Sequence, residues 1–298
     1  MATTDHATTP GPRTPAASTD ETSSADPFGA LLRAWRERRR LSQLALALDV
    51  GGSQRHLSFV ESGRSTPSRA MVLRLAEHLG VPLRERNRLL LAAGYAPVYA
   101  ERSLADPALT AARQAVERVL AGHEPYPALA VDRHWNLVAA NRALAPLLAG
   151  VDSALLEPPV NVLRLSLHPD GLAPRILNYV EWRAHLLDRL AQQVATSRDG
   201  VLAALADELR GYPLPDRGAD RCAPNVVGEH ATESAGVFVP LRLATDAGVL
   251  SLLGTTTIFG TPVDITLSEL ALECFFPADA ETAERLRSVA AGAGVAAG

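Results

Sequence analysis

Residues 50–68 read VGGSQRHLSFVESGRSTPS, and this stretch decides how the N-terminal part of the chain folds. It predicts a short helix over about residues 53–62. Ser53 is suited to cap this helix, because its hydroxyl can accept a hydrogen bond from a free N–H of the first turn. Gly63 is suited to end it, because glycine adopts the left-handed conformation of a helix C-terminus at little cost.

The two sides of this predicted helix carry different side chains. At roughly 100° per residue, Leu57 and Val60 fall on one side, which we expect to face a hydrophobic core. The other side carries Gln54, Arg55, Ser58 and Phe59. An amide, a guanidinium, a hydroxyl and an apolar ring are groups that can read base edges in a major groove. The alternative is a solvated face, which would more often carry Glu and Lys, so the pattern favours a DNA contact.

Helical spacing continues on both sides and predicts five short helices between residues 28 and 94, within a domain over 26–97. Ser42 is the expected cap of the second helix, and Thr66-Pro67 is the expected start of the fourth. The expected inward residues are Phe28, Leu31, Leu32 and Trp35 in the first helix, Leu44, Ala45 and Leu48 in the second, Met71, Leu73, Leu75, Ala76 and Leu79 in the fourth, and Leu89, Leu90, Leu91 and Ala92 in the fifth.

Several short motifs lie in and around the central helix: Leu41-Ser42-Gln43, Ser53, Leu57, Glu61-x-Gly63-Arg64 and Pro67-Ser68. With these motifs, residues 28–82 resemble the helix-turn-helix domain of the XRE-family and phage-repressor (lambda repressor-like) regulators. The resemblance implies an all-α fold of five helices whose third helix enters the major groove of double-stranded DNA. Gly51-Gly52 departs from the turn usual in that family, and the second glycine loosens the turn.

The same resemblance implies roles for residues beside the reading helix. Ser42 and Gln43 are expected to contact a phosphate, with Arg64 on the DNA backbone nearby and Ser53 at the start of the reading helix. Arg36 and Glu61 correspond to a pair that links the first and third helices inside the fold. We therefore expect that pair to be structural.

Charge is divided unevenly along the chain. The net charge is -4, and every basic residue other than histidine is Arg. Residues 27–100 contain twelve Arg and five acidic residues, a net charge of +7, whereas residues 101–298 contain sixteen Arg and twenty-four acidic residues, a net charge of -8. A basic module joined to an acidic one indicates a polyanion partner for the first module alone.

The remaining chain mixes helical and strand patterns. Residues 98–125 predict a connector with one helix over about 108–121. A domain over 126–288 opens with two short strands around Asp132-Arg133-His134, followed by a helix from about Asn141. A long helix is predicted over 174–194. It carries two apolar stripes that we expect to be covered, Ile176, Val180, Ala184, Leu187, Ala191 and Val194 in one and Tyr179, Trp182, Leu186 and Leu190 in the other.

Three segments near the C-terminus, 237–245, 249–259 and 263–276, are rich in β-branched and aromatic residues and are separated by short turns. In the last of them the apolar parity changes near Ser268, which predicts a β-bulge. Short connections favour antiparallel neighbours. We therefore expect an α+β domain in which helices pack on one face of an antiparallel sheet.

Three motifs in this half are Trp135-x-Leu-Val-Ala-Ala-Asn141, His168-Pro169-x-Gly171-Leu172 and Asn178-x-x-x-Trp182. Together with the strands over 237–276, they make residues 105–288 similar to the ligand-binding domain of the MmyB-like transcription regulators, a PAS-like fold. The resemblance implies a sensor for a small apolar or lipid-like molecule, such as a fatty-acid-like compound. Composition alone indicates only an apolar α+β domain.

The candidate ligand-binding residues are His168, Tyr179, Trp182, Arg183 and Leu186. Arg183 lies on a mostly apolar helix, and a guanidinium can bind the acidic head of an amphipathic ligand through two hydrogen bonds. Each residue also has a structural alternative. The aromatic and aliphatic side chains can be core, the histidine can hold a turn, and the arginine can point into water.

Motifs for catalysis and for metal binding are missing from the sequence, which lacks a nucleophile elbow, a zinc-binding His pair, a phosphate loop and a dinucleotide fingerprint. Cys222 and Cys274 are far apart and form no Cys-x-x-Cys motif, which argues against a disulfide framework or a zinc site. We expect Cys274 to be packed in the core, and the role of Cys222 stays open. No enzyme activity, metal or cofactor is predicted.

The ends of the chain predict a cytoplasmic protein without a membrane span. No run of 18 apolar residues occurs. Residues 1–25 lack the basic start and apolar middle of a signal peptide, so we expect a disordered tail there and a second flexible tail over 289–298.

Taken together, these features predict a ligand-responsive, sequence-specific DNA-binding regulator. Two copies in a homodimer would place their reading helices about one helical turn apart on an inverted repeat. The alternative keeps the DNA-binding domain but treats the second domain as a ligand-free module for dimerisation or protein interaction.

Overall fold

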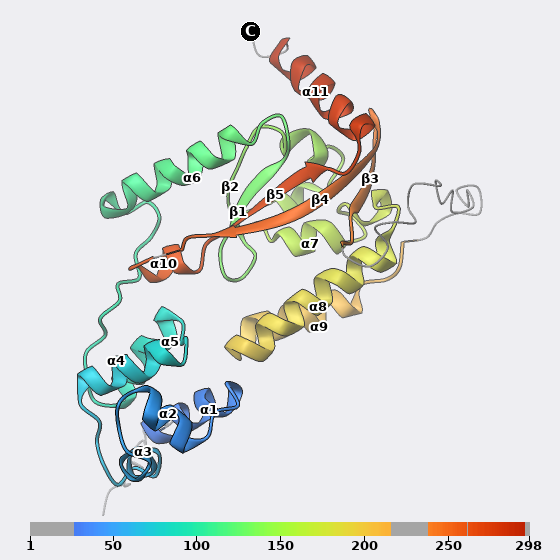
Figure 1. Cartoon of the computed structure of the whole chain (residues 1–298). Helices are drawn as coiled ribbons and strands as arrows, with labels where there is room; N and C mark the ends of the chain where they lie inside the picture. Colours follow the sequence, from blue (N-terminus) through green and yellow to red (C-terminus); the bar gives the residue numbers. More distant parts are fainter. Residues whose placement is uncertain (1–26, 216–237, 261, 296–298) are drawn as a thin grey trace, which may run out of the picture. The chain divides into compact units, whose positions relative to one another are not determined.

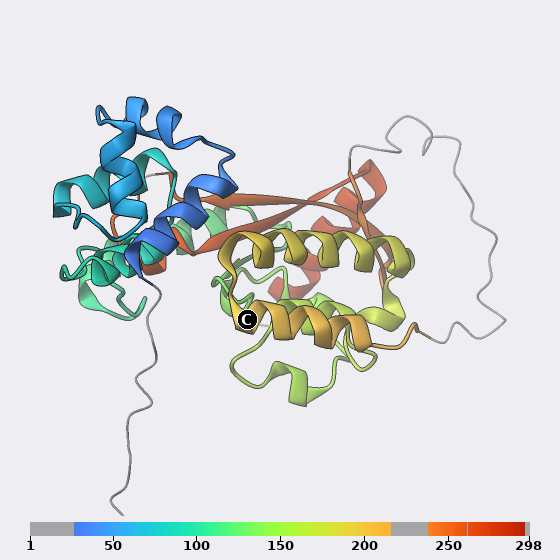
Figure 2. The ribbon, with the colours of Figure 1, turned by 90° about the horizontal axis from the view of Figure 1, so that it is seen from below.

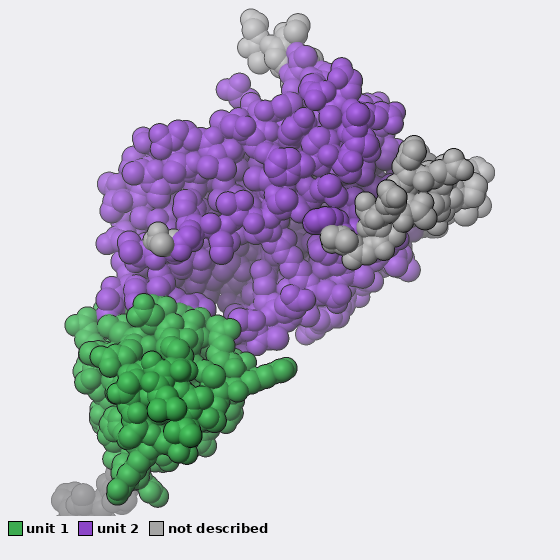
Figure 3. Space-filling model, in the orientation of Figure 1, with its two compact units in different colours: residues 1–81, 85–97 green, residues 82–84, 98–298 purple. Residues whose placement is uncertain are grey.

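The computed structural model describes residues 27–215, 238–260 and 262–295, and no side chains are described after residue 291. The predicted tail over 1–25 and Cys222 lie outside the described residues. The chain divides into two compact units, one of residues 1–81 and 85–97 and the other of residues 82–84 and 98–298 (Figure 3). Each unit is described by itself below.

The first unit is built from the five predicted helices (Figure 1). They are α1 (Phe28–Arg38), α2 (Gln43–Asp49), α3 (Gln54–Glu61), α4 (Arg69–His78) and α5 (Leu83–Ala92). Their core consists of aliphatic side chains that are almost fully buried, among them Leu32, Leu46, Val72, Leu75 and Leu90. Such a core accounts for the stability of five helices that are each too short to persist alone.

Three details of this unit differ from the predictions. Leu91, which was expected to face inward from α5, is 60% exposed. Leu46 and Ala47 are the buried residues of α2, whereas Leu44 and Leu48 are 50% and 67% exposed. The segment QLALALD is apolar on several sides, so its own pattern cannot select the inward face, and packing against α3 decides it. The cap of α4 is Ser68 and not Thr66, because the Ser68 hydroxyl accepts a hydrogen bond from the Met71 N–H at 3.2 Å.

The second unit is an α+β domain, as predicted. In chain order it contains η1 (Pro107–Leu109), α6 (Thr110–Gly122), β1 (Ala128–Val131), β2 (Leu137–Ala140), η2 (Ala145–Leu148), η3 (Ser153–Leu156), α7 (Val162–Leu167), η4 (Ala173–Arg175), α8 (Tyr179–Ser197), α9 (Gly200–Gly211), β3 (Leu241–Thr245), β4 (Gly248–Ile258), α10 (Ile265–Ser268), β5 (Ala271–Pro277) and α11 (Ala280–Val295). The strand order is β2-β1-β5-β4-β3, and all neighbouring pairs are antiparallel.

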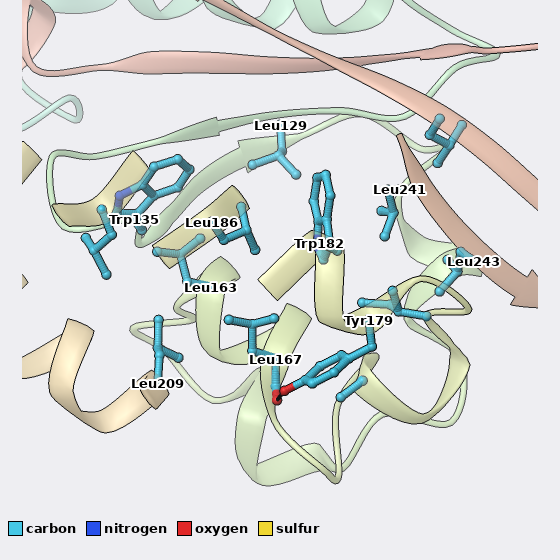
Figure 4. Packing of buried hydrophobic residues seen from close by; sticks show 14 of the residues in the cluster. Leu129, Trp135, Leu163, Leu167, Tyr179, Trp182, Leu186, Leu209, Leu241 and Leu243 are labelled. Carbon is cyan, nitrogen blue, oxygen red and sulfur yellow. Dashed lines mark hydrogen bonds between the residues drawn. The ribbon is translucent and has the colours of Figure 1, made fainter. Parts of the chain in front are cut away.

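Helices cover both faces of this sheet, whereas the sequence predicted helices on one face. Side chains from α7, α8 and α9 pack with one face to form the larger core, which includes Tyr179, Trp182 and Leu186 (Figure 4). On the other face, Val116 and Leu120 of α6 pack with a smaller cluster of sheet residues that includes Cys274. Cys274 is buried, as expected.

The long helix begins later than predicted, at Tyr179, and buries one stripe fully and the other only in part, since Leu187 and Val194 are partly buried against the core. Tyr179, Trp182, Leu186 and Leu190 are buried, whereas Val180 of the other stripe is 67% exposed. Helix α9, which the sequence analysis did not predict, lies beside α8 (Figure 2). A two-residue connection, Arg198-Asp199, joins the two helices and keeps them antiparallel.

The predicted bulge near Ser268 is a helical turn, α10. Asp264 caps it, since one carboxylate oxygen accepts a hydrogen bond from the Thr266 N–H at 2.9 Å. The helical turn explains why the apolar residues change from odd to even positions between 263 and 276, and β5 itself contains no bulge. At the C-terminus, α11 continues to Val295, through most of the segment predicted as a flexible tail.

In place of the helix predicted from Asn141, the structure has only the short 3-10 helix η2, and the side chain of Asn141 bonds to the backbone of other segments. Its Oδ1 accepts a hydrogen bond from the Ala128 N–H at 3.1 Å, and its Nδ2 donates to the carbonyl oxygens of Leu120 and Tyr126 at 3.1 and 2.7 Å. The residue is 7% exposed. Asn141 therefore joins the end of α6 to the first strand.

We expect Asn141→Ala to lower the free energy of unfolding by about 2–4 kcal/mol, because several buried backbone groups lose their partner. Urea denaturation followed by circular dichroism measures this change. Arg142→Ala, at the adjacent exposed position, is the control and should leave the urea midpoint unchanged. Equal midpoints for the two variants would contradict the anchoring role of the amide.

Among the described residues, every helix is too short or too polar to cross a membrane.

Candidate functional site

Helix α3 is held at both ends by local hydrogen bonds. At its start, the Ser53 hydroxyl accepts a hydrogen bond from the His56 N–H at 3.2 Å. At its end, Gly63 has a φ of +74°, and the Arg64 N–H donates to the Phe59 carbonyl at 2.8 Å. These bonds form the left-handed C-terminal motif that a glycine at this position predicts. These bonds fix where the helix begins and ends.

The inner side of α3 is buried and the outer side is open. Leu57 and Val60 are 4% and 2% exposed. Gln54 and Arg55 are exposed, and Ser58 and Phe59 are half-buried. The Arg55 guanidinium carbon lies 5.4 Å from the centroid of the Phe59 ring, so the cation stacks over the aromatic face. In the described unit, the four predicted base-contacting side chains therefore lie on an accessible surface.

His56 is an exposed residue of the first turn that the sequence analysis did not select. Helical spacing places it between Phe59 and Val60, at the border of the outer and the buried side, so the pattern did not select it. Ser42 is also exposed, and its hydroxyl accepts a hydrogen bond from the Ala45 N–H at 3.0 Å. Arg64 is exposed directly after α3.

The last residue of α3, Glu61, carries a buried carboxylate and is 5% exposed. Arg36 binds it with two hydrogen bonds, Nε to Oε1 at 2.7 Å and Nη2 to Oε2 at 3.0 Å, and its Nη1 donates to the Leu41 carbonyl at 2.8 Å. Gln43 Nε2 also donates to Glu61, at 2.8 Å. The Gln43 side chain, expected to contact a phosphate, is thus bonded inside the protein.

Gly29 allows α1 to approach the backbone of Val60 and Glu61 at the end of α3 closely. A Cβ atom at that position would lie 2.3 Å from the Glu61 carbonyl oxygen, which is far inside van der Waals contact. Only glycine fits between the two helices without a shift of the backbone. The sequence analysis did not single out this residue, since a glycine in the first turn of a helix has many other uses.

The surroundings of Glu61 determine its charge. Burial by itself would raise the pKa of this carboxyl, but the hydrogen bonds from Arg36 and Gln43 and the charges of Arg36 and Arg33 lower the pKa below its ordinary value. The carboxylate is therefore charged at neutral pH, and the pair is a buried ion pair.

The second unit contains a cavity of about 350 Å³ between the sheet and the helices α7 and α8. Most of its wall is apolar. The side chains that form this wall include Leu129, Trp135, Leu137, Leu144, Leu163, Trp182, Leu186, Leu241, Leu252 and Phe275. A volume of this size and an apolar lining are typical of a site for a small molecule.

One part of the cavity wall is polar. Arg189 of α8 binds Glu273 of β5 with two hydrogen bonds, at 2.6 and 3.1 Å, and donates to the Thr256 hydroxyl at 2.7 Å. The Arg189 guanidinium carbon also lies 4.5 Å from the centroid of the Trp135 ring. Glu273 is buried, with 6% of its surface exposed. Among the described residues, Arg189 is the one cation that forms hydrogen bonds with its carboxylate.

Two of the five predicted ligand-binding residues, Trp182 and Leu186, line the cavity. Tyr179 does not, because it is fully buried in the core beside Leu167 (Figure 4), and its hydroxyl donates to the Leu167 carbonyl at 3.0 Å. Burial raises the pKa of that hydroxyl, which keeps it a donor.

His168 and Arg183 also lie outside the cavity wall. The His168 Nδ1 accepts a hydrogen bond from the Asp170 N–H at 3.1 Å, so the histidine holds a turn. Arg183 Nη2 donates to the carbonyl oxygens of Leu209 and Arg210, at 3.3 and 2.6 Å, and thereby caps the end of α9. His168 therefore holds a turn, which is the structural alternative given for it above. The guanidinium of Arg183 binds the end of α9 and not, as had been expected, a ligand in the cavity.

The sequence analysis missed Arg189 and Glu273. A signal was present in both cases. Glu273 is a single carboxylate inside the apolar strand ALECFF, and Arg189 follows Trp182 and Leu186 at helical spacing. What the sequence could not show was that α8 crosses β5 at this point. Among the residues that the structure describes, no cluster of His, Cys, Asp and Glu is placed to hold a metal ion.

Removing one partner of the buried pair in the first unit should be costly. We expect Arg36→Ala to lower the free energy of unfolding of this unit by about 3–5 kcal/mol, because Glu61 is left as an uncompensated buried charge. Arg33→Ala is the matched control, since Arg33 is half-exposed and lies 3.5 Å from the same carboxylate. Its loss should cost about 1 kcal/mol or less. Thermal unfolding followed by circular dichroism compares the two.

The lowered pKa of Glu61 also predicts a pH dependence. The stabilisation from this carboxylate should be complete above its ordinary pKa and should be lost as the pH falls through the lower pKa of the folded state. Unfolding measured between about pH 6 and pH 3 should show this loss in the wild type. Glu61→Gln should be less stable at neutral pH and less sensitive to acid, and an unchanged acid dependence would contradict the assignment.

Comparison with known protein families agrees with this geometry. A family model for the MmyB-like transcription regulator ligand binding domain matches residues 112–289, and a helix-turn-helix domain model matches residues 27–89. A comparison with curated proteins gave no match. The first match covers more than half of the chain and contains the cavity. The protein therefore belongs to the family of transcription regulators with an MmyB-like ligand-binding domain, here preceded by a helix-turn-helix domain for DNA binding.

Proposed function

We propose that this regulator binds an inverted-repeat DNA site as a homodimer, and that an amphipathic small molecule in the cavity of the second unit controls its occupancy. The observation that supports DNA reading most strongly is the outer face of α3. A helix that is capped at both ends presents Gln54 and Arg55 to solvent, within a segment whose net charge is +7. Both features are expected of a helix that enters a major groove.

Within this proposal, each exposed group has a role that follows from its chemistry. The Arg55 guanidinium binds the acceptor edge of a guanine, the Gln54 amide binds an adenine, and the Phe59 ring contacts a thymine methyl. Ser58 donates to a neighbouring base edge. Ser42, Ser53 and Arg64 contact phosphates, which set the register of the helix but carry no sequence information.

We expect Arg55→Ala to weaken binding to the cognate site by about 1–3 kcal/mol and to relax the preference at one base pair. The cognate site is first selected from random DNA with the wild-type protein. Arg118→Ala is the matched control, because it removes an exposed arginine from α6. Equal affinity of the two variants for the selected site would contradict the role of Arg55.

Phosphate contacts should behave differently. Arg64→Ala should weaken binding to all sequences by a similar factor and should reduce the slope of log affinity against log salt by about 1. Fluorescence anisotropy with labelled duplexes at several salt concentrations measures both effects. A change in sequence preference without a change in slope would assign Arg64 to a base instead.

The cavity supports a ligand with an apolar body and one polar end. Leucine, tryptophan and phenylalanine side chains form most of the wall and suit a lipid-like chain. The polar end has a partner in Arg189. Because Glu273 already occupies that guanidinium, an acidic head group would compete with Glu273 or share the arginine with it. A fatty-acid-like compound satisfies these conditions.

Ligand control follows if the molecule binds one conformation of the dimer more tightly than another. Such a difference shifts the population of the conformation that matches the two half-sites. The magnitude of control is limited by the difference in affinity, and not by the affinity itself.

Native mass spectrometry of the purified chain tests the ligand. We expect an added mass that is lost in Leu163→Trp, because the larger side chain fills the cavity. Val180→Trp is the matched control, since Val180 is exposed on the other side of α8. If the wild type carries no added mass, and if fatty acids of different lengths leave its tryptophan fluorescence unchanged although Trp135 and Trp182 line the cavity, the second unit is an interaction module without ligand.

A further inference from the structure

Strand β4 is longer than its neighbour β3. Residues Gly248–Leu252 of β4 pair with β3, whereas residues Leu252–Ile258 pair with β5. After Leu252, β4 therefore has a strand on one side only among the described residues. Residues 254–258 are all exposed. This five-residue segment, GTTTI, is called the open edge below.

The direction of the backbone groups along β4 follows from Ser251. Its carbonyl accepts a hydrogen bond from the Ala278 N–H, and its N–H donates to the Thr282 hydroxyl, so both groups point to the β5 side. In an antiparallel strand the direction alternates with each residue. The N–H and C=O groups of Gly254, Thr256 and Ile258 therefore point away from β5, and no hydrogen bond to them exists within the described chain.

The open edge lacks the features that prevent strands from pairing. Natural sheets protect exposed edges with charged side chains, proline, bulges or short strands. Residues 253–259 read LGTTTIF and contain neither charge nor proline. The register with β5 is also continuous from Leu252 to Ile258, so no bulge interrupts it. Three consecutive threonines and an isoleucine favour the extended conformation.

We propose that the open edge pairs with the open edge of a second copy of this chain, antiparallel and centred on Thr256. The two sheets then form one continuous sheet across the twofold axis. In this register the outward groups of Thr256 bond to those of Thr256 of the partner subunit, and those of Ile258 bond to those of Gly254 of the partner subunit. Every outward N–H and C=O of the edge gains a partner.

Self-complementarity identifies a second copy as the occupant. A twofold axis requires the same patch on both subunits, and the open edge meets this condition because its donors and acceptors alternate symmetrically about Thr256. The side chains also match. Ile258, which is 68% exposed, faces a glycine of the other subunit and has room there. Thr255 faces Thr257, a β-branched pair that stabilises antiparallel strands.

The open edge also borders the cavity. Leu253 and Gly254 belong to the cavity wall, and the Thr256 hydroxyl binds Arg189. One strand therefore contacts both the ligand site and the other subunit. The pairing rests on the proposed homodimer and specifies the surface through which the two copies associate. Its failure would leave the DNA-reading face of α3 and the ligand site untouched, so the two proposals fail separately.

Sedimentation velocity of the full-length chain tests the pairing. We expect a monomer–dimer equilibrium whose dissociation constant rises about tenfold or more in Ile258→Pro, because proline removes an outward N–H from each subunit. The β4–β5 hydrogen bonds are spared, since the Ile258 N–H does not take part in them. Ile258→Thr is the matched control. It keeps the N–H and the β-branched side chain, and it should dimerise like the wild type.

Disulfide trapping tests the register and does not depend on the proline variant folding. Thr255 and Thr257 of opposite subunits would form a closely spaced pair, with Cα atoms about 4.5 Å apart. Two copies of Thr255 would be diagonal neighbours about 7–8 Å apart, too far for a disulfide. An oxidised mixture of T255C and T257C should therefore form a cross-linked dimer, whereas either variant alone should not.

Three results would overturn the proposal. They are a wild-type chain that stays monomeric at tens of micromolar, a dimer of unchanged affinity in a folded Ile258→Pro, and cross-linking of T255C or T257C alone to the same extent as the mixture. The wild type, oxidised in the same way, corrects for cross-links through Cys222 and Cys274.

Discussion

The buried carboxylate of Glu61 is the interaction on which the first unit depends. It receives hydrogen bonds from Arg36 of α1 and Gln43 of α2, and it lies at the end of α3. Arg36 also binds the Leu41 carbonyl, in the link between α1 and α2. Three helices therefore meet at one charged group. Since the group is buried, any other arrangement would leave a charge or a donor without a partner, and that requirement fixes the direction of α3.

The second unit uses an arginine–glutamate pair in a different setting. Arg189 and Glu273 lie at the wall of a cavity, whereas Arg36 and Glu61 are enclosed by protein. Both side chains of the second pair form part of the cavity wall, and the arginine compensates the charge of Glu273 there. The same chemistry thus stabilises one unit and forms the polar part of the cavity wall in the other.

Much of the fold was predictable from the sequence, because it follows from local signals. The caps at Ser42 and Ser53, the glycine at 63 and the apolar spacing set the helices of the first unit. Strand patterns and short turns predicted the antiparallel sheet of the second unit. Two of the wrong predictions occurred where a local pattern was consistent with two different structures. QLALALD is apolar on more than one side, and a change of parity near Ser268 fits a helical turn as well as a bulge.

By itself, the sequence determined the bounds of α3, its outward residues and the α+β class of the second unit, since capping and periodicity act over a few residues. Only the tertiary structure decided which residues line the cavity. Tyr179 and Arg183 lie on the same helix as Trp182, yet one bonds to the Leu167 carbonyl and the other caps α9. The meeting of Arg189 with Glu273 joins residues far apart in the chain. Such contacts depend on how α8 crosses the sheet, and no local pattern encodes a crossing between distant segments.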